Sequence, residues 1–338
     1  MNNLLKNKKV LIGGATFVAV LLVIIICIVA FGKKKPQGDP APGPGAYTQV
    51  QTNDDATKDL VRVAGIQGTP AGLAVSKDGT LLVTDDFNKV VWEVKSGEVT
   101  VLAGHSGPKD GHGEPLGGYN DASLLEARFE NLSGIARYLD GWAVSDAKNR
   151  VIRYFDGELV RTAAYKDSER TLTHPTGLAS DEAGNIYIAD AGTDLIYQMT
   201  PEGVLSVYAD GFSAPCGLCY SNNTLYVADT GNHRICSVKD GQVTVIAGDK
   251  DGFRDGDVAT ACFQSPKGVA VGEDGLIYVA DTGNSAIRVI RNGKVETLLK
   301  ESADRTWPAS PAALVPYEGG MAIADEFSGI VFVMPYAK

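Results

Sequence analysis

The chain has 338 residues, of which 44% are hydrophobic and 21% charged, enough apolar sequence to bury a sizeable core. Its formal net charge is −10 at pH 7, which argues against nucleic acid as a partner, because phosphate binding requires a basic face. Five cysteines are too few for a disulfide framework, although one bridge is compatible with the sequence.

The first predicted element is a membrane-spanning helix over residues 10–32. This segment contains no charged residue, and it is long enough to cross the hydrocarbon core of a bilayer, which needs about 20 residues. A cleaved signal peptide has a shorter apolar core, and the bulky Ile26 before Cys27 argues against a lipoprotein signal. We therefore predict an uncleaved single-pass anchor, preceded by a cytoplasmic tail over residues 1–9.

The charges that flank this anchor do not decide its orientation in the membrane. Lysines flank its two ends in nearly equal number, so the positive-inside rule does not separate the two orientations. Because a short basic tail is difficult to move across a membrane, we predict an extracytoplasmic position, at the cell membrane, for the rest of the chain; the opposite orientation would leave it in the cytoplasm. Residues 33–57 are rich in Pro, Gly and polar side chains and are predicted to form a flexible linker.

Residues 58–338 contain six imperfect copies of one pattern. Each copy has a Pro-x-Gly-like start, an apolar strand, a turn, a second strand that ends in Asp, and further short strands. Two-residue turns such as Ser96-Gly97 and Asp156-Gly157 favour tight hairpins with positive φ. Four short antiparallel strands per repeat are typical of a β-propeller blade. The copies start at Pro70, Leu132, Pro175, Pro215, Pro266 and Pro311, and their second strands end at Asp85, Asp146, Asp190, Asp229, Asp281 and Asp325.

The sixth copy ends after its third strand, and its missing fourth strand is found near the start of the domain. Residues 60–65 read LVRVAG, similar to the fourth strands at residues 99–104 and 243–248. We predict that they complete the last blade and close the ring, which removes the exposed edges of an open array. The alternative is an unrelated edge strand. The predicted fold class is therefore all-β, a six-bladed propeller closed by an N-terminal strand and preceded by one transmembrane helix.

Two copies carry a more specific signature. Asp229-Thr230-Gly231-Asn232 and Asp281-Thr282-Gly283-Asn284, each preceded by Tyr-Val-Ala, resemble NHL repeats. The resemblance covers roughly residues 60–338 and is most specific in the fourth and fifth copies. It implies a six-bladed propeller, but it implies no single activity, because this repeat serves both binding proteins and enzymes.

The face that carries the turns after the six aspartates also carries the connections between blades, and we call it the upper face. Its two long connections, residues 104–130 and 248–264, align with each other. Long loops on a rigid frame commonly carry function, but the same segments also suit plain connectors that place Phe129 and Phe263 between blades. The candidates for a ligand face are His105, His112, Tyr119, His174, His233, Arg234, Phe253 and Arg254.

No catalytic residue, metal ligand or cofactor is predicted. The six aspartates are expected to be structural, because an Asp before a tight turn accepts backbone N–H bonds. The four histidines are irregularly spaced, so they give no zinc signature, although a divalent metal stays an alternative. Cys216 and Cys219 form a C-x-x-C only by spacing, without the helix and βαβ unit of a redox motif.

The sequence favours a binding or sensing module whose upper face holds a protein, peptide or glycan. It shows no G-x-S-x-G motif and no phosphate-binding glycine loop. The alternative implied by the family resemblance is a metal-dependent lyase or hydrolase at the channel mouth. Amidating lyases with this type of repeat hold zinc with three histidines, whereas His174 alone lies beside a blade start here; lactonases of similar shape use carboxylate and Asn ligands. A structural spacer is a third alternative.

Overall fold

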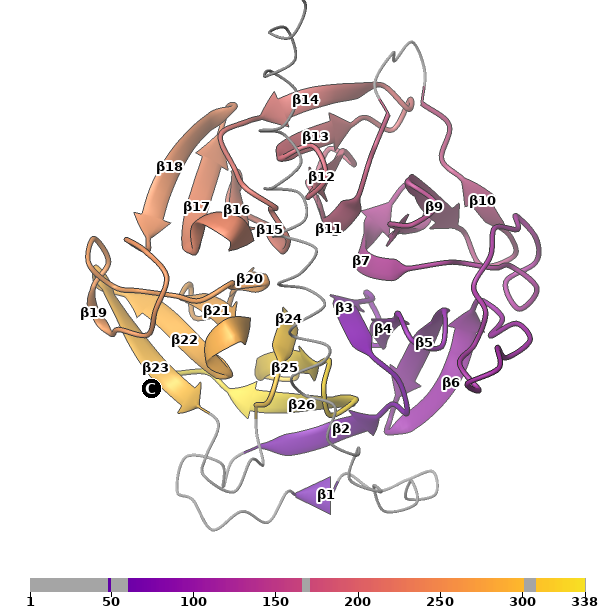
Figure 1. Cartoon of the computed structure of the whole chain (residues 1–338), viewed down its shortest axis with the longest axis horizontal. Helices are drawn as coiled ribbons and strands as arrows, with labels where there is room; N and C mark the ends of the chain where they lie inside the picture. The colour runs from indigo at the N-terminus through magenta and orange to yellow at the C-terminus, as the bar shows by residue number, and fades with distance from the viewer. Residues whose placement is uncertain (1–47, 50–59, 166–170, 301–307, 338) are drawn as a thin grey trace, which may run out of the picture. The chain divides into compact units, whose positions relative to one another are not determined.

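The computed structural model describes residues 48–49, 60–165, 171–300 and 308–337. These residues form six antiparallel sheets arranged as blades around one axis (Figure 1). Strand order runs outward from the axis in each blade, so the protein is the all-β six-bladed propeller that the repeats predict.

Each blade contributes one strand to each of four positions between the axis and the rim. The innermost strands are β3 (Pro70–Val75), β7 (Leu132–Tyr138), β11 (Pro175–Ser180), β15 (Leu218–Ser221), β20 (Gly268–Val271) and β24 (Pro311–Tyr317). The second strands are β4 (Leu81–Asp85), β8 (Gly141–Asp146), β12 (Ile186–Asp190), β16 (Thr224–Asp229), β21 (Ile277–Asp281) and β25 (Gly320–Asp325). The third strands are β5 (Val90–Lys95), β9 (Val151–Phe155), β13 (Leu195–Met199), β17 (Arg234–Lys239), β22 (Ala286–Arg291) and β26 (Ile330–Pro335). The outer strands are β6 (Glu98–Ala103), β10 (Val160–Thr162), β14 (Leu205–Ala209), β18 (Gln242–Ala247), β23 (Lys294–Lys300) and β2 (Val61–Gly65).

Four short elements lie outside this plan. Strand β1 (Thr48–Gln49) pairs with β2, and β19 (Gly256–Asp257) pairs with β23, so each adds a fifth strand to one blade. Two 3-10 helices, η2 (Thr230–Asn232) and η3 (Thr282–Asn284), follow the second strands of blades four and five. The two Asp-Thr-Gly-Asn motifs therefore form tight turns, each closed by a residue in the left-handed region, His233 or Ser285.

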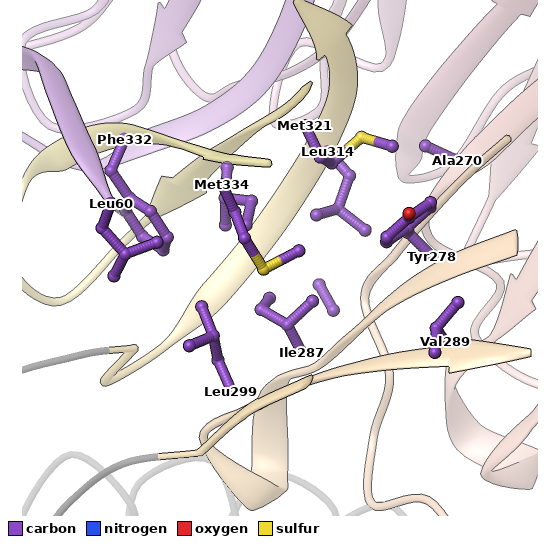
Figure 2. Close-up of a cluster of buried hydrophobic side chains, with 12 residues drawn as sticks. Leu60, Ala270, Tyr278, Ile287, Val289, Leu299, Leu314, Met321, Phe332 and Met334 are labelled. Atoms are coloured by element: carbon purple, nitrogen blue, oxygen red, sulfur yellow. The ribbon is translucent and has the colours of Figure 1, made fainter. Parts of the chain in front are cut away.

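The ring closes as the sequence predicts. Strand β2 pairs antiparallel with β26, with Val61 opposite Val333 and Gly65 opposite Ile330. The segment also supplies core residues: Leu60 is 1% exposed and belongs to the cluster between blades five and six. Figure 2 shows Leu60 beside Phe332 in this cluster. Burial of apolar side chains on both sides of the sixth blade therefore joins the two ends of the domain.

The third and fourth strands are joined by tight turns in three of the four hairpins that carry a turn signal. Ser96-Gly97, Asp240-Gly241 and Asn292-Gly293 all have positive φ at both residues, the conformation of a two-residue turn. At Asp156-Gly157 the prediction is wrong, because Phe155 pairs with Val160 and leaves a four-residue loop. There the Asp156 carboxylate accepts the Glu158 N–H at 3.3 Å, which stabilises the longer loop.

The Gly of the Pro-x-Gly start is explained by the close approach of neighbouring blades. The backbone N–H of Gly177 donates to the carbonyl of Cys216 at 3.1 Å, and that of Gly217 donates to the carbonyl of Lys267 at 2.7 Å. A Cβ at either glycine would collide with that carbonyl oxygen. The innermost strands therefore pack backbone to backbone around the axis, which brings the residue between Pro and Gly of each blade close to its neighbours.

The predicted tail (residues 1–9) and anchor (10–32) lie outside the described residues, as does the linker (33–57) apart from Thr48–Gln49. Within the part of the chain that the structure describes, no helix is long and apolar enough to cross a membrane.

Candidate functional site

The six aspartates at the ends of the second strands lie on the upper face, and none of their side chains is exposed (0% each). Each carboxylate accepts backbone N–H groups from the segment that enters its own blade. For Asp85 these are the N–H of Thr69 at 2.9 Å and two N–H groups of the following turn at 3.0 Å. Asp190 accepts the N–H groups of Thr173 and His174 at 2.6 and 2.8 Å. These bonds fix the upper turns to the sheets.

A buried arginine fixes the first long connection onto the second blade. The guanidinium of Arg153, on β9, is 0% exposed and donates to Asp146 at 3.2 Å and to Asp121 at 2.5 Å. It lies between two aromatic rings, with its central carbon 4.9 Å from the Tyr119 centroid and 5.1 Å from that of Phe129. We call this arrangement the arginine clamp of blade two.

The fifth blade, three blades further round the ring, repeats the same arrangement. Arg288 on β22 is 0% exposed and donates to Asp281 at 2.7 Å and to Asp255 at 2.5 Å. Its guanidinium carbon lies 4.7 Å from the centroid of Phe253 and 5.2 Å from that of Phe263. The aligned connections are therefore held in the same way on opposite sides of the propeller, next to β10 and β19 (Figure 1).

The clamps also join the connections to the rim of the blades. Asp121 accepts the backbone N–H of Thr162 at 3.0 Å, and Asp255 accepts that of Thr297 at 3.2 Å. Each aspartate therefore accepts a hydrogen bond from the backbone of an outer strand as well as from a buried arginine. The interpretation of Phe129 and Phe263 as residues packed between blades holds, since both are 0% exposed.

Sequence reasoning missed both clamp arginines. An Arg in the middle of the third strand is a usable signal: at this position it occurs only in the two blades that follow a long connection. In the first blade the same strand position holds Trp92, whose indole N–H donates to Asp85 at 2.9 Å. An Arg there, together with an aligned Asp in the preceding connection, would have indicated the contact.

The predicted ligand-face residues separate into different environments. Tyr119 and Phe253 are 55% and 41% exposed although one side of each ring covers a buried arginine. Arg254 bonds within its own connection, to the carbonyl of Thr260. Arg234 turns back to Asp229, with its Nε 2.7 Å from a carboxylate oxygen. Its pKa is raised: burial alone would lower it, but the Asp229 carboxylate stabilises the charge.

The four histidines do not come together. His105, His112 and His174 are exposed, and the Nδ1 of His233 accepts the backbone N–H of Ser265 at 3.0 Å. Among residues 60–165, 171–300 and 308–337, no three His, Cys, Asp or Glu side chains gather closely enough to hold a metal ion.

A second group of polar side chains, which sequence reasoning missed, converges around the upper end of the axis. Lys267 Nζ lies 2.6 Å from a carboxylate oxygen of Glu326 on the next blade. Asp86 on blade one accepts the side-chain amide of Asn131 on blade two. Cys216 lies at the start of the fourth blade, in the position that Lys267 occupies in the fifth. We call Asp86, Asn131, Cys216, Lys267 and Glu326 the axial cluster.

The pKa values of the cluster residues show that they influence one another. Burial raises the pKa of the Cys216 thiol, while the Lys267 ammonium acts in the opposite direction. For Lys267, burial alone would lower the pKa, but Glu326, Cys216 and Asp86 raise it above its usual value. Lys267 is therefore an ammonium at neutral pH, and Cys216 is a neutral thiol.

The lower face carries a cavity of about 320 Å³ lined by residues of blades one, five and six. Its walls include Asp78, Lys95, Glu273 and Tyr317. Lys95 and Asp78 form an ion pair at 2.9 Å in which both side chains are more than half exposed. Exposed pairs of this kind contribute little to stability.

Comparison with known protein families finds a match in two of the six blades. The NHL repeat family matches residues 212–236 and 263–290, the first three strands of blades four and five. This chain is a β-propeller that carries NHL repeats in blades four and five, and we refer to it as the NHL propeller. The NHL propeller is 47% identical over 72 residues to "NHL repeat-containing protein 2" of Gallus gallus, covering 21% of this chain and 10% of that protein. It is 36% identical over 101 residues to the Arabidopsis thaliana protein "SUPPRESSOR OF QUENCHING 1, chloroplastic", covering 28% and 10%. It thus matches about a tenth of the length of these curated relatives.

Solved structures resemble the NHL propeller over a larger share of its length. An auxiliary nutrient binding protein from Bacteroides thetaiotaomicron has a TM-score of 0.62 at 11% identity, covering 81% of this chain and 70% of its own. A gluconolactonase from Xanthomonas campestris has a TM-score of 0.59 at 17% identity, covering 89% and 98%. A virginiamycin B lyase from Staphylococcus aureus has a TM-score of 0.56 at 12% identity, covering 82% and 99%. At these identities the likeness shows a shared fold alone.

Proposed function

We propose that this NHL propeller is a binding module that captures a protein, peptide or glycan ligand on its upper face. The observation that carries the proposal is the state of Tyr119 and Phe253. Each ring is held in place by a buried arginine on one side and is 55% or 41% exposed on the other. Aromatic rings that are already fixed in position lose little conformational freedom when a ligand covers them.

The surroundings of these rings suit contact with a ligand. Leu116 and Leu125, on the same connection as Tyr119, are 45% and 59% exposed. Phe327 on the upper turn of blade six is 66% exposed. Aromatic side chains dominate the energy of binding surfaces when they fill a pocket of the partner. The structural neighbours include proteins named for nutrient binding, which supports the same class of function.

The test uses the full-length chain in lipid nanodiscs, probed with a random-peptide phage library and a glycan array. We expect a saturable binder that loses at least tenfold in affinity with Leu125→Ser, which leaves the contact with Arg153 intact, and with Phe253→Ser. The matched control is Leu139→Ser in a lower-face hairpin, where the side chain is 51% exposed. A binder that is insensitive to both upper-face variants, or no saturable binder at all, would contradict the proposal.

The proposal includes a location. An uncharged segment over residues 10–32 suits a single-pass anchor, which would present the propeller outside the cell membrane. Protease added to intact cells should then remove a C-terminal epitope tag, whereas a tag at residue 1 should be protected. Removal of the tag at residue 1 from intact cells, with the C-terminal tag protected until the membrane is permeabilised, would place the propeller in the cytoplasm.

A further inference from the structure

Lys267 of the axial cluster is the one long side chain at its position among the six blade starts. The second residues of the six blade starts lie at the inner edges of their blades, where neighbouring blades approach backbone to backbone. Five of them are small, and the sixth is Lys267: Ala71, Ser133, Thr176, Cys216, Lys267 and Ala312. The Lys267 side chain is 37% exposed.

Lys267 retains hydrogen-bonding capacity after its contact with Glu326. An ammonium group has three N–H donors. In the described part of the chain its side chain has one hydrogen bond, to Glu326 at 2.6 Å. Two donors of a charged, accessible group are thus available at the axis.

Asp86, on blade one, provides a carboxylate that complements the charge of the Lys267 ammonium. Its Oδ1 accepts the Asn131 amide and lies 3.2 Å from the Lys89 ammonium. No described residue donates to its Oδ2, and the side chain is 33% exposed. Asp86 and Glu326 directly follow the second strands of two neighbouring blades, one and six, and Lys267 contacts Glu326. The Asp86 carboxylate also raises the pKa of the Lys267 ammonium. A spare carboxylate oxygen and two spare N–H donors therefore share one end of the axis.

We propose that the axial cluster binds a small zwitterion, a molecule with one carboxylate and one ammonium group. The ligand carboxylate accepts hydrogen bonds from Lys267, and the ligand ammonium donates to Asp86. This proposal goes beyond the proposed function, since it assigns a separate, small ligand to the centre of the same upper face. It assigns Glu326 the role of a competitor, which occupies one Lys267 donor when the ligand is absent.

The charges of the cluster favour a zwitterion over a singly charged ligand. A simple anion at Lys267 would lie near the Asp86 and Glu326 carboxylates, and a simple cation at Asp86 would lie near the Lys267 ammonium. Like charges brought together without water are unfavourable, and this repulsion provides specificity. A ligand with both charges places each one next to its opposite.

Isothermal titration of the full-length chain in nanodiscs tests the proposal. The probes are glycine, 3-aminopropanoate, 4-aminobutanoate and 6-aminohexanoate, which separate the two charges by increasing distances. At least one should bind saturably, and its N-acetyl and methyl ester derivatives should each bind at least tenfold more weakly. If none of the four binds saturably, or if both derivatives bind as well as the parent, the proposal is wrong.

Variants identify the site. Lys267→Met keeps the apolar part of the side chain and should abolish zwitterion binding, and Asp86→Asn should weaken it at least tenfold. Glu326→Gln should strengthen binding several-fold, because it releases Lys267 from an internal carboxylate. The control is Glu296→Gln, which removes the carboxylate from the Arg291–Glu296 pair, also 2.6 Å long, and should change nothing. Unchanged affinity in Lys267→Met would overturn the proposal.

The two proposals fail in different ways. If phage or glycan binding depends on Leu125 and Phe253 while no zwitterion binds, the upper face is a binding surface and the axial site is wrong. If a zwitterion binds through Lys267 while substitutions at Leu125 and Phe253 have no effect on any ligand, the connections are plain connectors.

Discussion

Arg288 and Asp281 form an ion pair in which neither side chain is exposed, with 2.7 Å between the guanidinium nitrogen and the carboxylate oxygen. The arginine is satisfied further by Asp255 and by the carbonyl oxygens of Arg254 and Cys262 at 3.0 and 3.2 Å. Removing two charges from water is costly, and only several well-placed partners offset that cost. The pair therefore depends on the connection folding over it, and the connection depends on the pair.

Replacing a clamp arginine should destabilise the propeller strongly. Arg288→Met leaves the buried Asp281 without its countercharge, so we expect a loss of about 3–5 kcal/mol in the free energy of unfolding. Arg161→Met is the matched control, because Arg161 pairs with Asp156 at 2.5 Å while 49% exposed; it should cost much less, since an exposed ion pair contributes little to stability. Urea unfolding followed by tryptophan fluorescence measures both. A loss for Arg288→Met no larger than that of the control would show that the clamp does not stabilise the fold.

The closing segment should be as important to stability as the core of any other blade. Leu60 is 1% exposed and packs among residues of blades five and six. Leu60→Ala is expected to cost about 2–5 kcal/mol, the usual range for a buried leucine. Leu125→Ala, at 59% exposure, should change the free energy of unfolding by less than about 0.5 kcal/mol. Equal midpoints for the two variants in urea would mean that ring closure contributes little.

The blades could be predicted because each copy repeats the same local signals at a fixed spacing. The closure could be predicted because residues 60–65 read like other fourth strands, and hydrophobic pattern specifies strand register. The clamp was harder, since Asp121 and Arg153 are distant in sequence and meet only when the connection folds back along the blade. An isolated Arg in an apolar strand gives no sign of its partner.

The axial cluster could not be predicted for a different reason. Lys267 and Glu326 belong to different blades, and their contact depends on how closely neighbouring innermost strands approach. The glycines of the blade starts allow that approach, because a Cβ at Gly177 or Gly217 would collide with the backbone of the next blade. The four histidines, which the sequence offers as ligand-face candidates, lie apart in the fold, whereas Lys267, the variable residue of its Pro-x-Gly start, makes a contact between blades.

A single strained residue offers a route to a more stable protein. Leu139 lies in a lower-face hairpin at φ 53°, in the left-handed region, and is 51% exposed. That conformation costs a branched residue about 1–2 kcal/mol, and Asn adopts it more readily. Leu139→Asn should therefore raise the free energy of unfolding by about 1 kcal/mol. Leu159→Asn, also exposed but without positive φ, is the control and should give no gain; a gain of equal size there would point to surface polarity rather than backbone strain.

The reactivity of Cys216 reports on the axial cluster without any ligand. The thiolate is the reactive form of cysteine, and burial raises the Cys216 pKa above its usual value of about 8.5. The Lys267 ammonium acts in the opposite direction because it stabilises the thiolate. Lys267→Met should therefore move the midpoint of the pH–rate profile for alkylation of Cys216 by iodoacetamide to higher pH. Burial also raises the pKa of Cys219, with no contribution from Lys267, so its profile should stay unchanged in the same mass-spectrometric experiment. A Cys216 midpoint that does not move would show that Lys267 does not act on that thiol, and the axial cluster would then lack one of the contacts that define it.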